Sequence, residues 1–189
     1  MVPVPLSALW LPILAAAVLV FIASSVVHMA LRYHKTDYTQ LPDEESARAT
    51  LGKQNLNPGL YFIPYCPDMK DMAKPEVIKK FEEGPVALLT VFPKGRMNLG
   101  PYLVKWFVFC VFISFVAAYL AGRVLQPTTD YLHVFRVAGT AAWLGYGAAG
   151  ISAGIWQGRP WSVVLKDQLD SLIYAGVTGG AFGWLWPRG

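Results

Sequence analysis

The sequence predicts an all-α integral membrane protein with four transmembrane helices and a small cytoplasmic α+β insert between helices one and two. Hydrophobic residues make up 54% of the 189 residues and charged residues only 15%, against roughly 45–50% and about 25% in soluble domains. Four apolar stretches approach the roughly 20 residues that cross a bilayer. Tryptophan and tyrosine lie near most ends of these stretches, as they do at membrane interfaces.

The first two apolar stretches are residues 9–31 and 102–121. No positively charged residue precedes the first, and no small-residue cleavage motif follows it, so we expect an uncleaved anchor. The second is rich in bulky aromatic residues, which predicts a place at the rim of the bundle, facing lipid or another subunit. The chain then divides into a first helix in residues 1–32, an insert in 33–100 and a three-helix region in 101–189.

The insert carries equal numbers of acidic and basic residues and is too apolar in places for a plain linker. LPDEESARATL at 41–51 begins with a proline and acidic residues, as helices do. KPEVIKKFEEG at 74–84 predicts a second helix, closed by its glycine. GLYFIPY at 59–65 and PVALLTVF at 85–92 predict strands. The expected order is therefore α-β-α-β.

Small residues fill the third stretch, 131–156, and the fourth, which ends at Trp186 and begins between Trp161 and Ser171. The QGRP turn between them predicts a tight antiparallel hairpin held by van der Waals contact. The glycines expected to pack this hairpin are Gly150, Gly154, Gly179 and Gly183. The residues of the fourth helix expected to face lipid are Leu169, Ile173, Val177 and Trp184.

Lysine and arginine near the ends of the stretches predict the orientation. With the insert in the cytoplasm, seven basic residues lie on the inner side, namely Arg32, Lys35, Lys94, Arg96, Lys105, Arg159 and Lys166. Three lie on the outer side, namely Arg123, Arg136 and Arg188. Both termini are therefore expected to be periplasmic.

Charged residues at the start of the fourth helix leave two interpretations open. Counting about 20 residues back from Trp186 places Asp167 at the inner interface and Asp170 about one turn deeper. In the favoured interpretation the acids mark the membrane edge, and Lys166 pairs with Asp170 along the helix. In the alternative, Asp170 turns toward the protein beside Tyr174 and has a functional role. The candidate functional residues are Asp170, Lys166, Tyr174 and Asp167.

No other chemistry is visible in the sequence. Nucleotide-binding, metalloprotease and hydrolase motifs do not occur, and no basic run suggests nucleic-acid binding. His28 and His133 are expected near opposite membrane faces and so cannot share one haem. LRYHKTDY at 31–38, with His34 and Asp37, predicts a basic anchor at the membrane edge. We therefore expect no catalytic residue, no metal and no cofactor.

Three phrases, YHKTDYTQLPDEE, GPVALLTVFP and FGWLWPR, resemble a group of small uncharacterised bacterial inner-membrane proteins. The resemblance extends over most of the chain. It implies a multi-pass protein of the bacterial inner membrane with four spans, and it implies no activity, cofactor or catalytic residue.

These observations favour a non-enzymatic protein whose partners are the lipid bilayer and a membrane protein, either as accessory subunit of a larger complex or as a homo-oligomer. The alternative is a small transporter or channel that uses the polar face of the fourth helix, with Asp170, Tyr174 and Thr178 along its path. An enzyme that uses the insert is the least favoured class.

Overall fold

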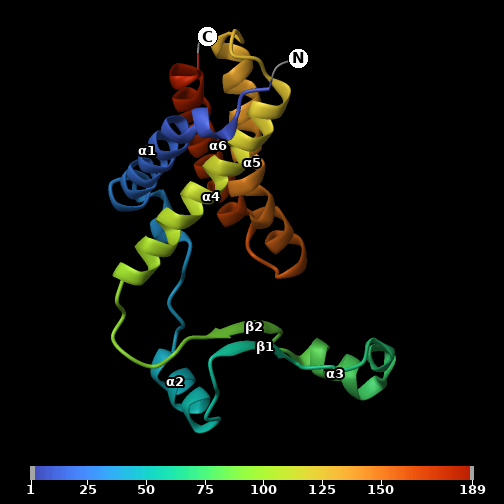
Figure 1. Ribbon diagram of the computed structural model, residues 1–189. Helices are drawn as coiled ribbons and strands as arrows, with labels where there is room; N and C mark the ends of the chain where they lie inside the picture. The colour runs from blue at the N-terminus through green and yellow to red at the C-terminus, as the bar shows by residue number, and fades with distance from the viewer. Residues whose placement is uncertain (1–2, 188–189) are drawn as a thin grey trace. The chain divides into compact units, whose positions relative to one another are not determined.

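The computed structural model describes residues 3–187 and divides the chain into two compact units. The helical unit comprises Met1–Tyr38 and Asn98–Gly189, and the insert unit comprises Thr39–Met97. The chain is mostly helical and has one small two-stranded sheet, as predicted (Figure 1). Arg188, one of the residues used to predict the orientation, lies outside the described residues.

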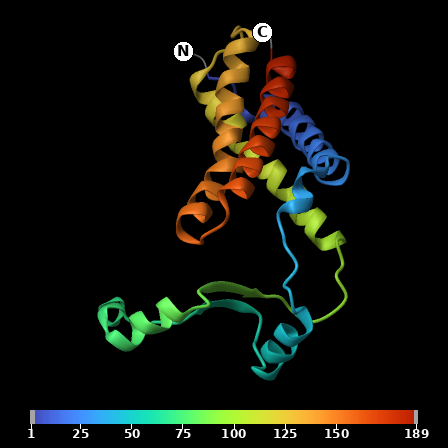
Figure 2. The same cartoon turned by 180° about the vertical axis from the view of Figure 1, so that it is seen from behind.

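The helical unit consists of four long helices and two short 3-10 helices. The long helices are α1 (Trp10–Met29), α4 (Gly100–Val124), α5 (Tyr131–Trp156) and α6 (Trp161–Leu185). The 3-10 helices are η1 (Leu6–Ala8), before α1, and η2 (Arg32–Thr36), after it. Both α1 and α5 pack against α4 and α6, so the four long helices form one bundle (Figure 2).

Two helices, α1 and α4, are long and apolar enough to cross a membrane by length and composition, whereas the sequence analysis predicted four spans. Helices α5 and α6 are as long, but their glycines and polar residues make them less apolar on average. Only 39% of the apolar window of α1 and 28% of that of α4 are buried in the protein. Neither therefore has the mostly buried surface of a core helix in a soluble domain.

Small side chains form most of the core between the helices. One cluster gathers alanines of α1, α4, α5 and α6 around Val134 and Phe182. A second cluster contains Ala17, Cys110 and Tyr174. The outward faces of the helices are also apolar, so the helical unit presents hydrophobic side chains both inward and outward, unlike an amphipathic surface helix.

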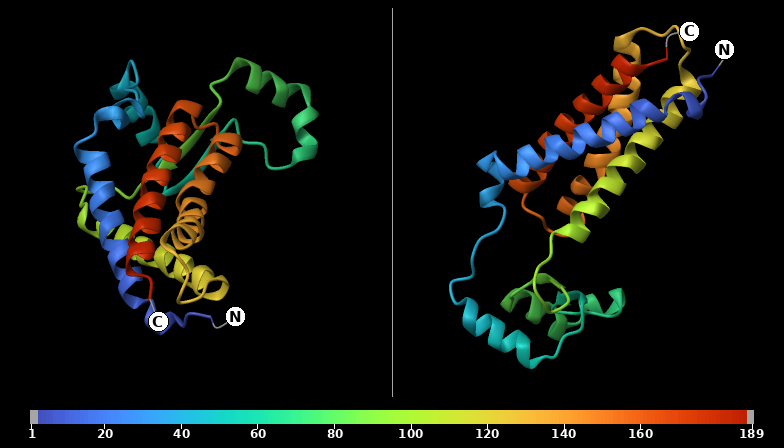
Figure 3. Two further views of the ribbon diagram at one scale, coloured as in Figure 1. Left: turned by 90° about the horizontal axis from the view of Figure 1, so that it is seen from above. Right: turned by 60° about the vertical axis from the view of Figure 1, so that its left-hand side comes forward.

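Helices α5 and α6 run side by side and approach to backbone distance at glycines (Figure 3). A Cβ atom on Gly179 would lie 2.7 Å from the carbonyl oxygen of Phe135. A Cβ atom on Gly183 would lie 2.6 Å from the ring of Tyr131. Only glycine allows the two helices to pack this closely at these positions.

The other two glycines of the predicted hairpin lie nearer its turn. A Cβ atom on Gly154 would lie 3.0 Å from Val164, and one on Gly150 would lie 3.4 Å from Gln168. The contact is therefore looser at this end of the hairpin than at Gly179.

The predicted lipid-facing side of α6 is only partly correct. Leu169 and Trp184 are largely exposed, but Ile173 and Val177 pack against the cluster around Ala17. The reason is that α6 contacts α1 as well as α5, so a wider part of its surface is covered than a two-helix hairpin requires.

The insert unit has the predicted α-β-α-β order, with an additional 3-10 turn. Its elements are α2 (Glu44–Lys53), β1 (Gly59–Ile63), η3 (Met69–Ala73), α3 (Pro75–Glu83) and β2 (Ala87–Val91). The strands are antiparallel, with Gly59 opposite Val91 and Ile63 opposite Ala87. Taken by itself, this unit buries none of its side chains.

The glycine contact between α5 and α6 can be tested with alanine substitutions. Gly179→Ala should destabilise the protein by about 1–3 kcal/mol, because its methyl group would overlap the backbone at Phe135. The matched control is Gly176→Ala, since a Cβ atom there would have no neighbour within 4 Å. Thermal unfolding in mild detergent measures both, and equal melting temperatures for the two variants would contradict the contact.

Candidate functional site

Asp170 is buried, although α6 is largely apolar around it. The residue is 5% exposed and lies on the third turn of the helix. The favoured interpretation, a solvated acid at the membrane edge, is therefore wrong for this residue. A buried carboxylate requires hydrogen bonds or a counter-charge, because its transfer out of water is costly.

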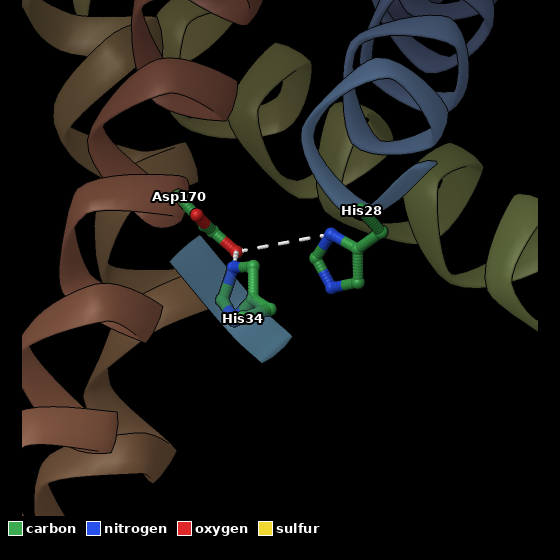
Figure 4. Close-up of side chains that lie close together, drawn as sticks. All are labelled: His28, His34 and Asp170. Carbon is green, nitrogen blue, oxygen red and sulfur yellow. Dashed lines mark hydrogen bonds and ion pairs between the residues drawn. The ribbon is translucent and has the colours of Figure 1, made fainter. Parts of the chain in front are cut away.

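Side chains from the end of α1 and from η2 surround the Asp170 carboxylate (Figure 4). The hydroxyl of Tyr33 donates a hydrogen bond to Oδ1. Nε2 of His34 lies 3.0 Å from Oδ2, and Nδ1 of His28 lies 4.0 Å from the same oxygen. The rings of His28 and His34 are tilted by 31° to each other, with centroids 4.6 Å apart.

Burial, followed by the hydrogen bond to Asp170, raises the pKa of Tyr33 well above its ordinary value. The phenol therefore keeps its proton near neutral pH. Tyr33 acts as a permanent hydrogen-bond donor to the buried carboxylate.

A second carboxylate, Asp37, holds the other side of His34. Nδ1 of His34 lies 2.6 Å from Oδ2 of Asp37, and the ammonium of Lys166 donates to Oδ1 at 2.7 Å. The same ammonium donates to the hydroxyl of Thr36 at 2.8 Å. Burial opposes ionisation of Asp37, but the hydrogen bonds from Lys166 and His34 outweigh it and lower its pKa. Asp37 is therefore ionised at neutral pH.

The predicted pairing of Lys166 with Asp170 is replaced by these contacts. Asp170 turns inward toward His34, whereas Lys166 extends to Asp37 on the chain segment after α1. Asp167 pairs instead with Arg159, whose Nη1 lies 2.8 Å from its Oδ2. Both acids of α6 thus bind partners that helical spacing does not indicate.

The domain boundary predicted at residue 33 also changes, because the segment after α1 belongs to the helical unit as far as Tyr38. Tyr33, His34 and Asp37 attach this segment to α6. The segment was predicted to be a basic anchor at the membrane edge.

A cavity of about 680 Å³ opens beside Asp170, between all four long helices. Its lining is mostly apolar or aromatic. Trp106, Tyr146 and Tyr174 pack together on one side of it, with ring centroids 5.4 to 6.0 Å apart. Its polar lining includes His28, Asp170 and the Arg159–Asp167 pair. This size and this mixed lining are typical of sites that bind small molecules.

Asp170 and Tyr174 were predicted as candidates, but the other members of the cluster at Asp170 were not, namely Tyr33, His28, His34 and Asp37. One signal was present, because the predicted orientation places both His28 and His34 at the same membrane face as Asp170. The interaction itself joins residues more than 130 positions apart, so local spacing could not show it.

Comparison with family models, curated proteins and solved structures finds no match to this chain.

The contact between Lys166 and Asp37 can be measured with a double-mutant cycle. Lys166→Met and Asp37→Asn should show a coupling of about 1–3 kcal/mol in unfolding free energy, because the charged hydrogen bond is largely shielded from water. Lys166→Met and Asp170→Asn should show less coupling, since no direct contact joins these two side chains. The reverse order would mean that Lys166 instead pairs along the helix.

Proposed function

We propose that this protein is an integral inner-membrane protein with four spanning helices that binds a small molecule with an apolar body and a polar end. It acts as a non-enzymatic accessory subunit of a membrane complex or as a homo-oligomer. The observation that supports this proposal best is the cavity between the helices, whose polar lining includes the buried Asp170.

The lengths of α5 and α6 and the positions of their polar groups support their assignment as the remaining two spans. Their 26 and 25 residues correspond to about 38 Å at about 1.5 Å per residue, which exceeds the roughly 30 Å hydrocarbon core. Three polar residues of α6, Asp170, Ser171 and Thr178, are buried in the bundle. Polar groups that face the interior lower the average hydrophobicity of a helix without exposing polarity to lipid.

The chemistry of the cavity indicates the class of ligand. Apolar and aromatic side chains such as Leu103, Trp106 and Tyr174 suit a hydrocarbon or ring system. His28 and Asp170 suit a group that forms hydrogen bonds. The hydroxyl of Tyr146, which also lines the cavity, is buried beside the thiol of Cys110, a weak hydrogen-bond partner, and has no stronger partner within residues 3–187. An amphiphile from the membrane matches all three features.

The insert unit supports the proposal of a partner subunit or a second copy. Large apolar side chains of its sheet, including Leu60, Phe62 and Leu88, are exposed when the unit is taken by itself. A two-stranded sheet is marginally stable in water unless other elements cover it. A second protein surface would provide this cover. The outward aromatic residues of α4, such as Phe112 and Phe115, suit either lipid or the same partner.

A transporter or channel is the second candidate function, because Asp170, Tyr174 and Thr178 are all buried at helical spacing along α6. The packed rings of Trp106, Tyr146 and Tyr174 lie across this path, so transport would require them to separate. Ion flux into liposomes that is lost in Asp170→Asn would favour this function over simple binding.

The proposed orientation places the insert unit in the cytoplasm and both termini in the periplasm. A cysteine introduced by Ser46→Cys in a Cys66→Ser background should resist a membrane-impermeant thiol reagent in whole cells and react after lysis. Ser46 is exposed on the insert unit, so the bilayer would be the barrier. Labelling in intact cells would reverse the orientation.

The binding and assembly proposals can be tested together by native mass spectrometry of protein extracted in lipid nanodiscs. The wild type should carry a bound small molecule and have the mass of an oligomer or complex. Ser25→Phe should remove the bound molecule, because Ser25 lines the cavity. Val26→Phe is the matched control, since Val26 is 51% exposed and is not among the residues that line the cavity. A monomer that carries no ligand would overturn both proposals.

A further inference from the structure

We propose that His28, His34 and Asp170 form a binding site for one divalent transition-metal ion. This inference concerns a function beyond the binding of an amphiphile, and it does not depend on what occupies the cavity. It also departs from the expectation that the chain binds no metal.

The three side chains present their ligand atoms to one point. One ligand atom from each residue lies within 4.8 Å of the other two, and Nδ1 of His28 and Nε2 of His34 both lie within 4.0 Å of Oδ2 of Asp170. Metal–ligand bonds of about 2.1 Å at tetrahedral or octahedral angles place ligand atoms roughly 3.0–3.4 Å apart. The His34–Asp170 distance of 3.0 Å already fits, and the His28–Asp170 distance of 4.0 Å must shorten. The side chain of His28 is 57% exposed and therefore has room to move inward.

Two of the three ligands are oriented by a further hydrogen bond, as ligands in metalloproteins usually are. Asp37 faces Nδ1 of His34, which leaves Nε2 to face Asp170. Tyr33 donates to Oδ1 of Asp170 and leaves Oδ2 to face the histidines. The carboxylate–histidine arrangement of Asp37 and His34 fixes the tautomer that a metal ion requires.

The charges at the site also favour a cation. With the Nδ1 proton of His34 donated to Asp37, Nε2 is left with a lone pair that faces Oδ2 of Asp170 at 3.0 Å. Two lone pairs at this distance repel each other unless a positive charge lies between them. A proton or a bound metal ion between the two atoms would supply it, and the exposed His28 beside the same oxygen adds a ligand that a proton does not need.

The donor set indicates which ions would bind. Two imidazole nitrogens and one carboxylate oxygen suit Zn²⁺, Fe²⁺ and their neighbours in the first transition row. Mg²⁺ and Ca²⁺ prefer all-oxygen sites, and Cu⁺ prefers sulfur. Three protein ligands leave at least one coordination position open, and the cavity borders both His28 and Asp170.

The test uses the full-length protein, purified in mild detergent and freed of metal with EDTA. Co²⁺ is titrated into it and its binding is followed by visible absorption. The affinity for Zn²⁺ is then measured from its competition with bound Co²⁺. One ion should bind per chain and give the ligand-field bands of a coordinated Co²⁺ ion. His28→Gln and Asp170→Asn should weaken binding by about tenfold or more, and Asp37→Asn by about 10–100-fold. Because the side chain of His28 is exposed, its substitution should leave the fold intact.

His133→Gln is the matched control. His133 is also exposed and also lies beside an aspartate, Asp130, but it has no third ligand among the described residues. Its substitution should leave the affinity unchanged. The inference is overturned if the wild type shows no saturable binding, or if His28→Gln binds Co²⁺ as tightly as the wild type. Native mass spectrometry of the same metal-free sample reports ligand binding and assembly separately, so failure here does not depend on the proposed function.

Discussion

The buried carboxylate of Asp170 is the constraint on which this end of the helical unit depends. A carboxylate that leaves water without partners costs several kcal/mol. Within residues 3–187, its close hydrogen-bonding partners, Tyr33 and His34, both come from the chain segment after α1. This segment must therefore return to α6 as soon as α1 ends, and the short helix η2 makes this return possible.

The arrangement of the site follows from the difference between the two ends of the α5–α6 hairpin. At Gly179 and Gly183 the helices approach to backbone distance and leave no room for a ligand. Toward the turn, larger side chains hold the helices further apart, and α1 and α4 leave the cavity beside Asp170. The rings of Trp106, Tyr146 and Tyr174 lie at this transition, where bulky side chains are needed to fill the widening space. The close packing at one end and the cavity at the other thus both follow from the change from glycine contacts to larger side chains along the hairpin.

The sequence was a good guide wherever structure depends on local pattern. The predicted bounds of the third stretch, 131–156, are those of α5, and the insert has its predicted order of elements. Of the four predicted spans, only α1 and α4 are apolar enough to cross a membrane by length and composition, since α6 places polar residues such as Asp170 and Thr178 inside the bundle. The site itself required contacts between α6 and a segment that precedes it by about 130 residues, and helical spacing gives no information about such contacts.

The position of the site in the chain connects it to the insert unit. Asp37, which binds both His34 and Lys166, lies two residues before Thr39, where the insert unit begins. The hydrogen bonds that compensate Asp170 therefore also fix the point at which the chain leaves the helical unit. The pKa of Asp37 is lowered from its ordinary value of 3.8. The stabilisation from its charged form is therefore fully present above that pH and is lost as the pH falls through the lowered pKa. At neutral pH the ammonium of Lys166 holds Asp37, and Tyr33 and His34 bind Asp170, so the segment is attached to α6 through two carboxylates.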